Sequence, residues 1–178
     1  DNEASLLVNA MHRHGIDTQA MIKTAARPTI AKTRILGGHQ QMMRLDQEIT
    51  AELSASEVSH VSQAIQAALE QQPALVILSD YAKGLLTEDI CQHVIHYCRT
   101  HKIPVLVDPK GRNYHKYRGA TALTPNKKET AEACDTQVND PALIEKASTL
   151  KAGLSLDFLA VTRGEEGISL ITDRIEHL

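Results

Sequence analysis

Two stretches near the N-terminus carry apolar residues at helical spacing. In residues 2–14 the three- and four-residue intervals place these residues on one face, and Gly15 follows as a typical residue beyond a helix C-terminus. The second stretch opens with Ser54 and Glu57, which have capping-box spacing, and ends before Pro73. The apolar positions are Leu6, Leu7, Ala10 and Met11 in the first stretch and Val58, Val61, Ile65 and Leu69 in the second. The pattern predicts one amphipathic helix in each stretch.

Residues 16–49, between these helices, have a different pattern. Apolar and polar residues alternate, threonine is frequent, and charged residues lie within the alternating runs. Gly37 and Gly38 separate two such runs, and a glycine pair in this position is typical of a β-hairpin turn. We expect residues 16–49 to form a hairpin or a small antiparallel sheet.

The rest of the chain alternates short apolar runs with helical stretches. The runs are continuous, as in strands that are buried on both faces of a parallel sheet, and the stretches between them have the length of crossover helices. The runs are residues 74–79, 103–108, 120–125 and 157–162. A final pair of short runs around Asp173 and Arg174 predicts a hairpin at one edge. The expected fold class is α/β, with a doubly wound, mainly parallel sheet and a small β lid hairpin.

Composition excludes several functional classes. The 178 residues suit a single folded domain, and no apolar run approaches the roughly 18 residues of a membrane helix, so no membrane partner is expected. A net charge of −3 and only 3% aromatic residues argue against a nucleic-acid partner. The three cysteines are an odd number without Cys-x-x-Cys spacing, which argues against a disulfide framework and favours a cytoplasmic location.

Polar and charged residues follow each of the four apolar runs. In an open parallel sheet the ligand binds beyond the carboxyl ends of the strands, so these segments are expected along one edge. Lysines and free backbone N–H groups suit phosphate oxygens, and carboxylates suit hydrated Mg²⁺ and sugar hydroxyls. The runs lead into SDYAKG (79–84), DPKG (108–111), TPNKKE (124–129) and TRGEEG (162–167). Together they predict a nucleotide- or phosphate-binding site.

Each of these motifs also has a purely structural interpretation. Asn126 and Glu129 could be no more than the capping box of the following helix. The glycines of Thr162-x-Gly-x-x-Gly could serve only a turn, and Asp108 before Pro109 could end a strand. Their occurrence at four successive strand ends favours a binding site. Neither the P-loop motif nor Gly-x-Gly-x-x-Gly follows any strand, which argues against P-loop NTPases and Rossmann dehydrogenases.

In order and spacing, SDYAKG, DPKG, YRGATALTPNKKE and VTRGEEG resemble the ribokinase-like (PfkB) sugar kinases, and RPTIAKTRIL and HQQMMRLDQE resemble the lid of such kinases. Within the family the resemblance is greatest to kinases of D-glycero-β-D-manno-heptose 7-phosphate, and it extends over essentially the whole chain. It implies ATP- and Mg²⁺-dependent phosphorylation of that sugar at its anomeric hydroxyl to the 1,7-bisphosphate. This is a step of ADP-heptose synthesis for lipopolysaccharide.

The resemblance also implies roles for individual residues. It places an Asn-x-x-Glu segment and a glycine-containing loop at the nucleotide phosphates, namely Asn126, Lys127, Lys128, Glu129, Thr162, Gly164 and Gly167. Asp108 and Glu129 are expected near Mg²⁺, with Glu129 acting through water. The residues expected to bind the substrate are Asp80, Lys83, Lys110, Arg34 and Arg44.

The hairpin corresponds to the family's lid. Its basic residues Lys32, Arg34 and Arg44 could hold the phosphate of the substrate when the lid closes over the sugar. The alternative is that they only keep an exposed sheet in solution. Lid strands with a free edge pair between subunits in this family, so a homodimer is expected.

Two segments of such kinases do not occur in this sequence. These are a Gly-Gly-containing sugar-binding segment and a Gly-Ala-Gly-Asp segment whose aspartate is the general base. Residues 1–178 are therefore expected to be the central part of a kinase domain, with residues 16–49 as the lid and the catalytic base beyond Leu178. Alone they are expected to be nearly inactive. The alternative is a non-catalytic module for nucleotide binding or dimerisation.

Overall fold

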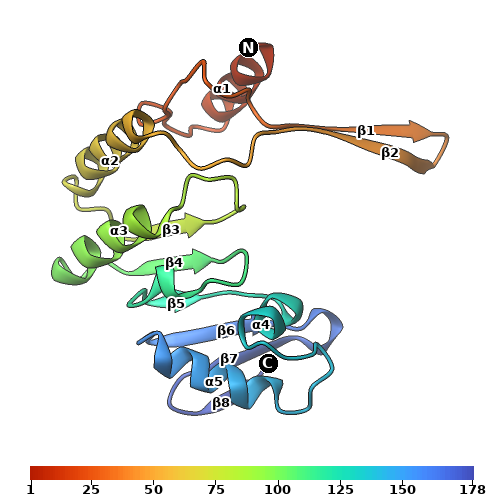
Figure 1. Ribbon diagram of the computed structural model, residues 1–178, viewed down its shortest axis with the longest axis vertical. Coiled ribbons are helices and arrows are strands. Elements are labelled where there is room, and N and C mark those ends of the chain that lie inside the picture. Colours follow the sequence, from red (N-terminus) through yellow and green to blue (C-terminus); the bar gives the residue numbers. More distant parts are fainter.

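The computed structural model describes residues 1–178, which form a projecting hairpin and a layered α/β body (Figure 1). The hairpin strands are β1 (Ala31–Gly37) and β2 (Gln40–Gln47). The body contains a sheet of six strands, β3 (Val76–Ser79), β4 (Val105–Asp108), β5 (Ala122–Leu123), β6 (Phe158–Thr162), β7 (Ile168–Ile171) and β8 (Ile175–His177). The helices are α1 (Asn2–Arg13), α2 (Ala55–Leu69), α3 (Glu88–Thr100), α4 (Lys127–Ala133) and α5 (Leu143–Gly153). No helix combines the length and the apolar character needed to cross a bilayer.

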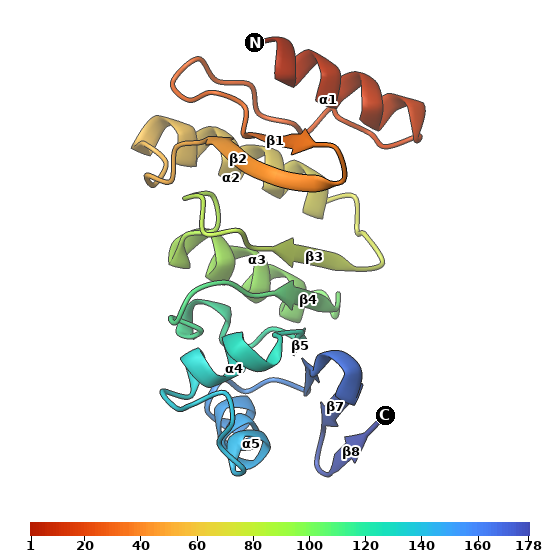
Figure 2. The same cartoon turned by 90° about the vertical axis from the view of Figure 1, so that its right-hand side faces the viewer.

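The sheet follows the order of the chain. Strands β3 to β6 are neighbours in sequence order and parallel, and β7 and β8 continue the sheet as an antiparallel hairpin. The predicted α/β class with a mainly parallel sheet is confirmed. Because parallel connections are right-handed and every step goes to the next strand in the same direction, the crossovers lie on one face. In Figure 2, α4 and α5 lie on one side of strands β7 and β8.

The core lies between this face and the helices. A row of five side chains in register across five strands is buried there: Leu78, Val107, Leu123, Leu159 and Ile171. Cys91, Val94, Ile95 and Cys98 of α3 and Ala147 of α5 belong to the same core cluster. The next row points to the opposite face, where Ile77 is 65% exposed. The continuous apolar runs predicted strands that are buried on both faces. In the structure this second face is buried at Ala122 but exposed at Ile77, so its burial differs from strand to strand.

The hairpin is shorter than the alternating pattern suggested. Residues 16–30 contain no strand, and Pro28, which has no backbone N–H to donate to a ladder, lies just before β1. The N–H of Thr29 donates instead to the carboxylate of Asp1. From there β1 and β2 extend away from the body (Figure 1).

The base of the hairpin packs closely against the loop that follows β3. Gly84 has φ +85°, and a Cβ atom added there would lie 2.1 Å from the Ala51 carbonyl oxygen. Arg27 joins the same segments, because its guanidinium donates hydrogen bonds to the carbonyl oxygens of Lys83 and Ala51. Only glycine fits at position 84.

We expect Gly84→Ala to destabilise the protein more than Gly111→Ala. Both glycines have positive φ, +85° and +84°, so alanine costs about 1 kcal/mol at either position. Gly111 has open space where a Cβ would point, whereas Gly84 faces backbone, so Gly84→Ala should cost about 2 kcal/mol more. Denaturant unfolding of both variants measures the difference, and equal losses would contradict the close packing at Gly84.

Candidate functional site

The four strand-end segments meet at one edge of the sheet. Ser79 pairs with Asp108, and the N–H of Asp80 donates to the Asp108 carbonyl oxygen over 2.9 Å. On the neighbouring strands Asn126 forms a bridge with Thr162, whose N–H donates to the Pro125 carbonyl oxygen over 3.0 Å. The predicted convergence of these segments is therefore present in the structure.

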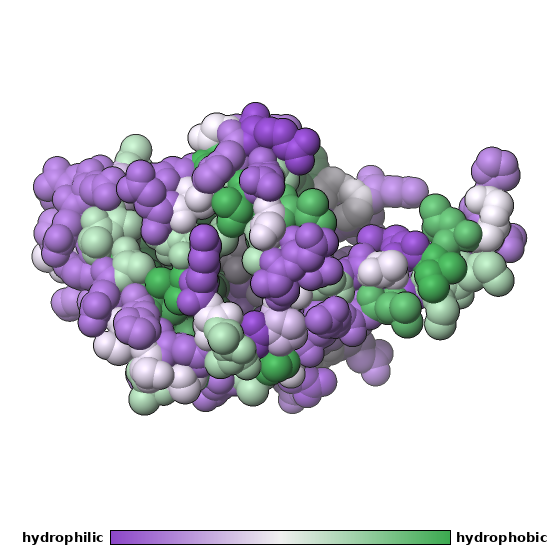
Figure 3. Space-filling model, turned by 90° about the horizontal axis from the view of Figure 1, so that it is seen from above, coloured by the Kyte–Doolittle hydropathy of each residue, from purple (hydrophilic) through white to green (hydrophobic).

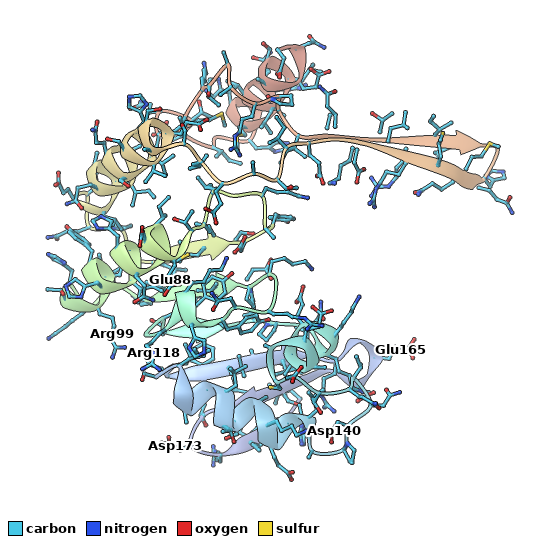
Figure 4. The ribbon with its side chains drawn as sticks, in the orientation of Figure 1. Glu88, Arg99, Arg118, Asp140, Glu165 and Asp173 are labelled. Atoms are coloured by element: carbon cyan, nitrogen blue, oxygen red, sulfur yellow. The ribbon has the colours of Figure 1, made fainter.

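The same edge carries the projecting hairpin. In Figure 4, Glu165 of the turn η2 (Gly164–Glu166) lies on the side of the molecule toward which the hairpin extends. Arg99 and Arg118 lie at the opposite ends of the strands. The hairpin therefore extends beyond the edge where the predicted site residues lie.

Asn126 and Glu129 form the capping box that begins α4. The Glu129 N–H donates to Asn126 Oδ1 over 2.9 Å, and the Asn126 N–H donates to Glu129 Oε2 over 3.0 Å. Lys110 Nζ lies 2.7 Å from the other Glu129 oxygen, Oε1. These contacts bring the DPKG and TPNKKE segments together. The structural interpretation of this motif is therefore correct, and it leaves a binding role open because each carboxylate oxygen can accept a further hydrogen bond.

Glu129 remains ionised in this setting. The residue is only 9% exposed, and burial alone would raise the pKa of the carboxyl group. The hydrogen bonds from Lys110 and from the Asn126 N–H outweigh burial and hold the pKa of Glu129 below its ordinary value. The site thus contains a fixed carboxylate at neutral pH.

The TRGEEG segment is tied to the start of α4. Lys127 Nζ pairs with Glu166 Oε1 over 2.8 Å. Gly164 has φ +65° and open space around its missing side chain, whereas a Cβ at Gly167 would lie 1.9 Å from the Leu178 carbonyl oxygen. Gly167 thus serves packing, and Gly164 leaves an open stretch of backbone.

The side chain of Asp108 has no polar partner within the protein. It is exposed and makes neither an ion pair nor a hydrogen bond. No group of three or more His, Cys, Asp or Glu side chains comes together as a metal cage. Asp108 and Glu129 therefore suit a Mg²⁺ ion that keeps most of its waters and is held mainly by substrate phosphates.

Asp80 is buried within a network that the sequence did not reveal. It is 5% exposed and accepts hydrogen bonds from Lys116 Nζ at 2.5 Å, the Tyr117 hydroxyl at 2.6 Å and the Ala82 N–H at 2.7 Å. Burial raises the pKa of Asp80, but Lys116 and Tyr117 outweigh it, so the pKa lies below its ordinary value. Lys116 and Tyr117 belong to η1 (His115–Tyr117), which carries no recognisable motif. In this structure the Asp80 carboxylate faces protein donors.

The remaining predicted lysines differ in their surroundings. Lys83 Nζ lies 2.6 Å from Glu48 Oε1 at the base of the hairpin. Lys128 is 76% exposed and faces Glu132 at 3.9 Å along the helix. Lys128 is therefore the predicted nucleotide-binding residue that the structure engages least.

The hairpin has one charged face and one apolar face. Arg34 and Arg44 stand directly opposite each other across the strands, where two like charges repel. Arg44 donates to Asp46 over 2.8 Å, whereas Arg34 has no acidic partner. The same face carries Lys32 between Asp46 and Glu48. The charged face is linked through Glu48 to Lys83, in the loop that follows β3.

A cavity of about 630 Å³ adjoins this region, between residues 16–30, α2 and the end of β3. Its walls are mainly apolar and include Met21, Val61, Ile65 and Leu86, while Asp80 and Lys83 lie at one side. No sequence pattern predicts this cavity, because its walls come from segments far apart in the chain.

Comparison with known proteins identifies the family. Residues 1–177 match the family model described as pfkB family carbohydrate kinase. The chain belongs to this family. The resemblance expected from the strand-end motifs is thereby confirmed.

The pfkB-family relatives include longer proteins. The protein named "Bifunctional protein HldE" from Methylobacillus flagellatus is 60% identical over 172 residues, which cover 96% of this chain and 35% of the relative. One of the same name from Magnetococcus marinus is 42% identical over 184 residues, covering 99% of this chain and 37% of the relative. The chain thus spans about a third of the length of these relatives.

Solved structures confirm the ribokinase-like fold. A protein named Sa239 matches with a TM-score of 0.75 at 14% identity, covering 100% of this chain and 57% of that one. A ribokinase from Arabidopsis thaliana, complexed with ribose and ATP, matches with a TM-score of 0.57 at 16% identity, covering 86% of this chain and 49% of that one.

Proposed function

We propose that these residues are part of a kinase that transfers the γ-phosphoryl group of ATP to the anomeric hydroxyl of D-glycero-D-manno-heptose 7-phosphate. The hydroxyl oxygen forms a bond to the γ-phosphorus, the bond to the ADP oxygen breaks, and a proton leaves the hydroxyl. The products are the 1,7-bisphosphate and ADP, in the cytoplasmic synthesis of ADP-heptose. The proton acceptor we expect is an aspartate beyond Leu178.

The observation that carries the proposal is the single edge shared by the strand-end motifs and the cationic face of the hairpin. Phosphoryl transfer depends mainly on positioning and on neutralising spread negative charge. Asn126, Glu129 and the open backbone at Gly164 would serve the nucleotide phosphates, with Lys110 and Lys127 as nearby cations. The membership of the pfkB family and the resemblance to heptose 7-phosphate kinases support the choice of reaction.

Mg²⁺ fits the acidic side of this edge. We assign it to Asp108 and Glu129 through water molecules, because Asp108 is exposed and Glu129 already accepts two hydrogen bonds from the protein. When bound, the ion would neutralise charge on the ATP phosphates. The protein's own part is to hold both carboxylates ionised and in place.

The direct test is ADP release by the full-length protein. With Mg²⁺ and ATP we expect turnover with heptose 7-phosphate and at least about tenfold less with fructose 6-phosphate, since hydrogen bonds to missing or misplaced hydroxyls discriminate strongly. Absence of ADP release with every sugar phosphate would reject the proposed kinase activity.

We predict that Arg34→Ala and Arg44→Ala weaken the binding of the sugar phosphate. Removing one cation that contacts a phosphate should raise the KM for heptose 7-phosphate by about tenfold and leave the KM for ATP unchanged, since charge-assisted hydrogen bonds are worth about 1.5–3 kcal/mol. Arg174→Ala, at an exposed arginine in the β7–β8 turn, is the matched control. Unchanged sugar KM values in both hairpin variants would mean that these arginines only keep the hairpin in solution.

The apolar face of the hairpin supports the expected homodimer. Ala31, Thr33 and Ile35 of β1 and Met43 and Leu45 of β2 share this face by their register. Hydrophobic side chains are prominent on the projecting hairpin in Figure 3. We propose that two hairpins pack through these faces. Sedimentation of Ile35→Lys and Met43→Lys in the full-length protein should give a monomer, and a persistent dimer would locate the interface elsewhere.

A further inference from the structure

One ion pair joins residues 31–48 of the hairpin to the body. Among the hydrogen bonds and ion pairs of residues 31–48, only the contact between Glu48 Oε1 and Lys83 Nζ, at 2.6 Å, reaches the rest of the chain. All others join the two hairpin strands to each other, lie within β2 or join β1 to Glu48. Besides the packing at the base of the hairpin, where Gly84 meets Ala51 and Arg27 joins the two segments, this pair is therefore the polar contact that bears on how the hairpin is oriented.

Glu48 contacts both the hairpin and the loop that follows β3. Its Oε2 accepts a hydrogen bond from Lys32 Nζ at 3.1 Å while Oε1 accepts one from Lys83. Hydrogen bonds from Lys83 and then Lys32 hold the pKa of Glu48 below its ordinary value, so the carboxylate is charged at neutral pH. A carboxylate with two lysines on its two oxygens fixes the distance between hairpin and loop more narrowly than a single contact does.

The contacts continue outward from Glu48 along the charged face. Lys32 also lies 3.1 Å from Asp46 Oδ2, and Asp46 accepts two hydrogen bonds from the Arg44 guanidinium at 2.8 and 3.1 Å. The series from Lys83 to Arg44 is thus continuous. It links the SDYAKG loop to one of the two arginines assigned to the sugar phosphate.

We propose that Glu48 is the positioning residue that holds the cationic face of the lid toward the strand-end edge. In this role Glu48 acts through the lid and contacts neither substrate nor nucleotide itself. Its charge orients the lid before substrate binds, so that Arg34 and Arg44 need less rearrangement to reach the phosphate. The effect on substrate binding rests on the proposed function, whereas the effect on lid orientation does not.

The ion pair between Glu48 and Lys83 can be removed without disturbing the hairpin. In Glu48→Ala the antiparallel ladder and the pairs of Asp46 with Lys32 and Arg44 remain, because none of them involves Glu48. Glu48→Asp keeps the charge on a shorter side chain and should restore part of the function. Glu52→Gln is the matched control, since the Glu52 side chain is exposed, lies in the same connection and makes no hydrogen bond or ion pair.

The first measurement is the orientation of the lid in the full-length protein. Spin labels at His39→Cys in the hairpin turn and Gln63→Cys on α2, both exposed positions, would be combined with Cys134→Ser and diluted with unlabelled protein. Cys91 and Cys98 are fully buried. Without substrate, we expect Glu48→Ala to broaden the label-to-label distance distribution and Glu52→Gln to leave it unchanged. An unchanged distribution in Glu48→Ala would overturn the inference.

The second measurement is steady-state kinetics of the same variants without labels. Glu48→Ala should raise the KM for heptose 7-phosphate by about fivefold, the change expected from losing one partly exposed ion pair, with the KM for ATP unchanged. Glu48→Asp should recover part of the loss. A broadened distance distribution with an unchanged sugar KM supports the role of Glu48 and would reject the proposed contact of the lid with the phosphate. The two proposals thus fail separately.

Discussion

Asp80→Ala is expected to cause the largest loss of stability of any single change at the site. It would leave the Lys116 ammonium, only 15% exposed, without its carboxylate and the buried Tyr117 hydroxyl without its acceptor. Removing one partner of a buried ion pair costs about 3–5 kcal/mol, which corresponds to a fall in Tm of roughly 10 °C for a domain of this size. Calorimetry of the full-length protein measures this shift.

Two comparisons separate this loss from a general effect of removing an acid. Asp157→Ala removes an exposed aspartate whose side chain makes no hydrogen bond or ion pair, so its Tm should stay within about 2 °C of the original. Asp80→Asn keeps the shape and one acceptor oxygen, so its Tm should lie between those of Asp80→Ala and Asp157→Ala. If Asp80→Ala behaved like Asp157→Ala, the network around Asp80 would contribute little.

The contribution of Asp80 should also depend on pH in a defined direction. The pKa of Asp80 in the folded protein lies below the ordinary value of 3.8, so the folded state favours the charged form. The stabilisation is therefore fully present above about pH 4 and disappears as the pH falls through the folded pKa. The difference in Tm between the original protein and Asp80→Asn should be constant from pH 5 to 8 and shrink in more acidic solution.

Most of the fold could be predicted because local patterns and tertiary structure agree. The capping boxes at Ser54 and Asn126 begin helices as expected, since their hydrogen bonds join residues three apart and need no distant partner. The strands of the sheet coincide with the apolar runs, because they are the segments that can fill its buried face. The short strand β5, with only two residues, shows that the ends of a run are less predictable than its centre.

The convergence of the site could be predicted from topology, but its internal contacts could not. Parallel strands bring their carboxyl ends to one edge whatever residues follow them, and this rule placed Asp108 and Asn126 together. The partners of Asp80 depend on how η1 packs, which no local pattern encodes. The same holds for Glu48, which looks like an ordinary residue of an exposed strand and meets Lys83 across 35 positions. Long-range ion pairs of this kind need the fold before they can be recognised.

Asn126→Ser and Glu129→Gln are expected to lower activity strongly while the helix remains stable. Serine is as good an N-cap as asparagine, and glutamine can replace glutamate at the third helical position of a capping box. The two changes therefore keep the structural role of the motif. They remove the side-chain amide and the fixed negative charge, so we expect kcat/KM for Mg²⁺ and ATP in the full-length protein to fall by about a hundredfold for Glu129→Gln and about tenfold for Asn126→Ser.

The matching alanine variants show what the capping box alone is worth. Asn126→Ala and Glu129→Ala should each cost about 1 kcal/mol of stability in addition to the loss of activity, because each removes one of the two hydrogen bonds of the capping box. A Ser-x-x-Gln variant that is stable and fully active would show that this motif only begins a helix, and the nucleotide would have to bind elsewhere. A Ser-x-x-Gln variant that is stable but inactive would separate helix capping from nucleotide binding. The cap is then intact, and only the negative charge and the amide are missing from the edge where the four strands end.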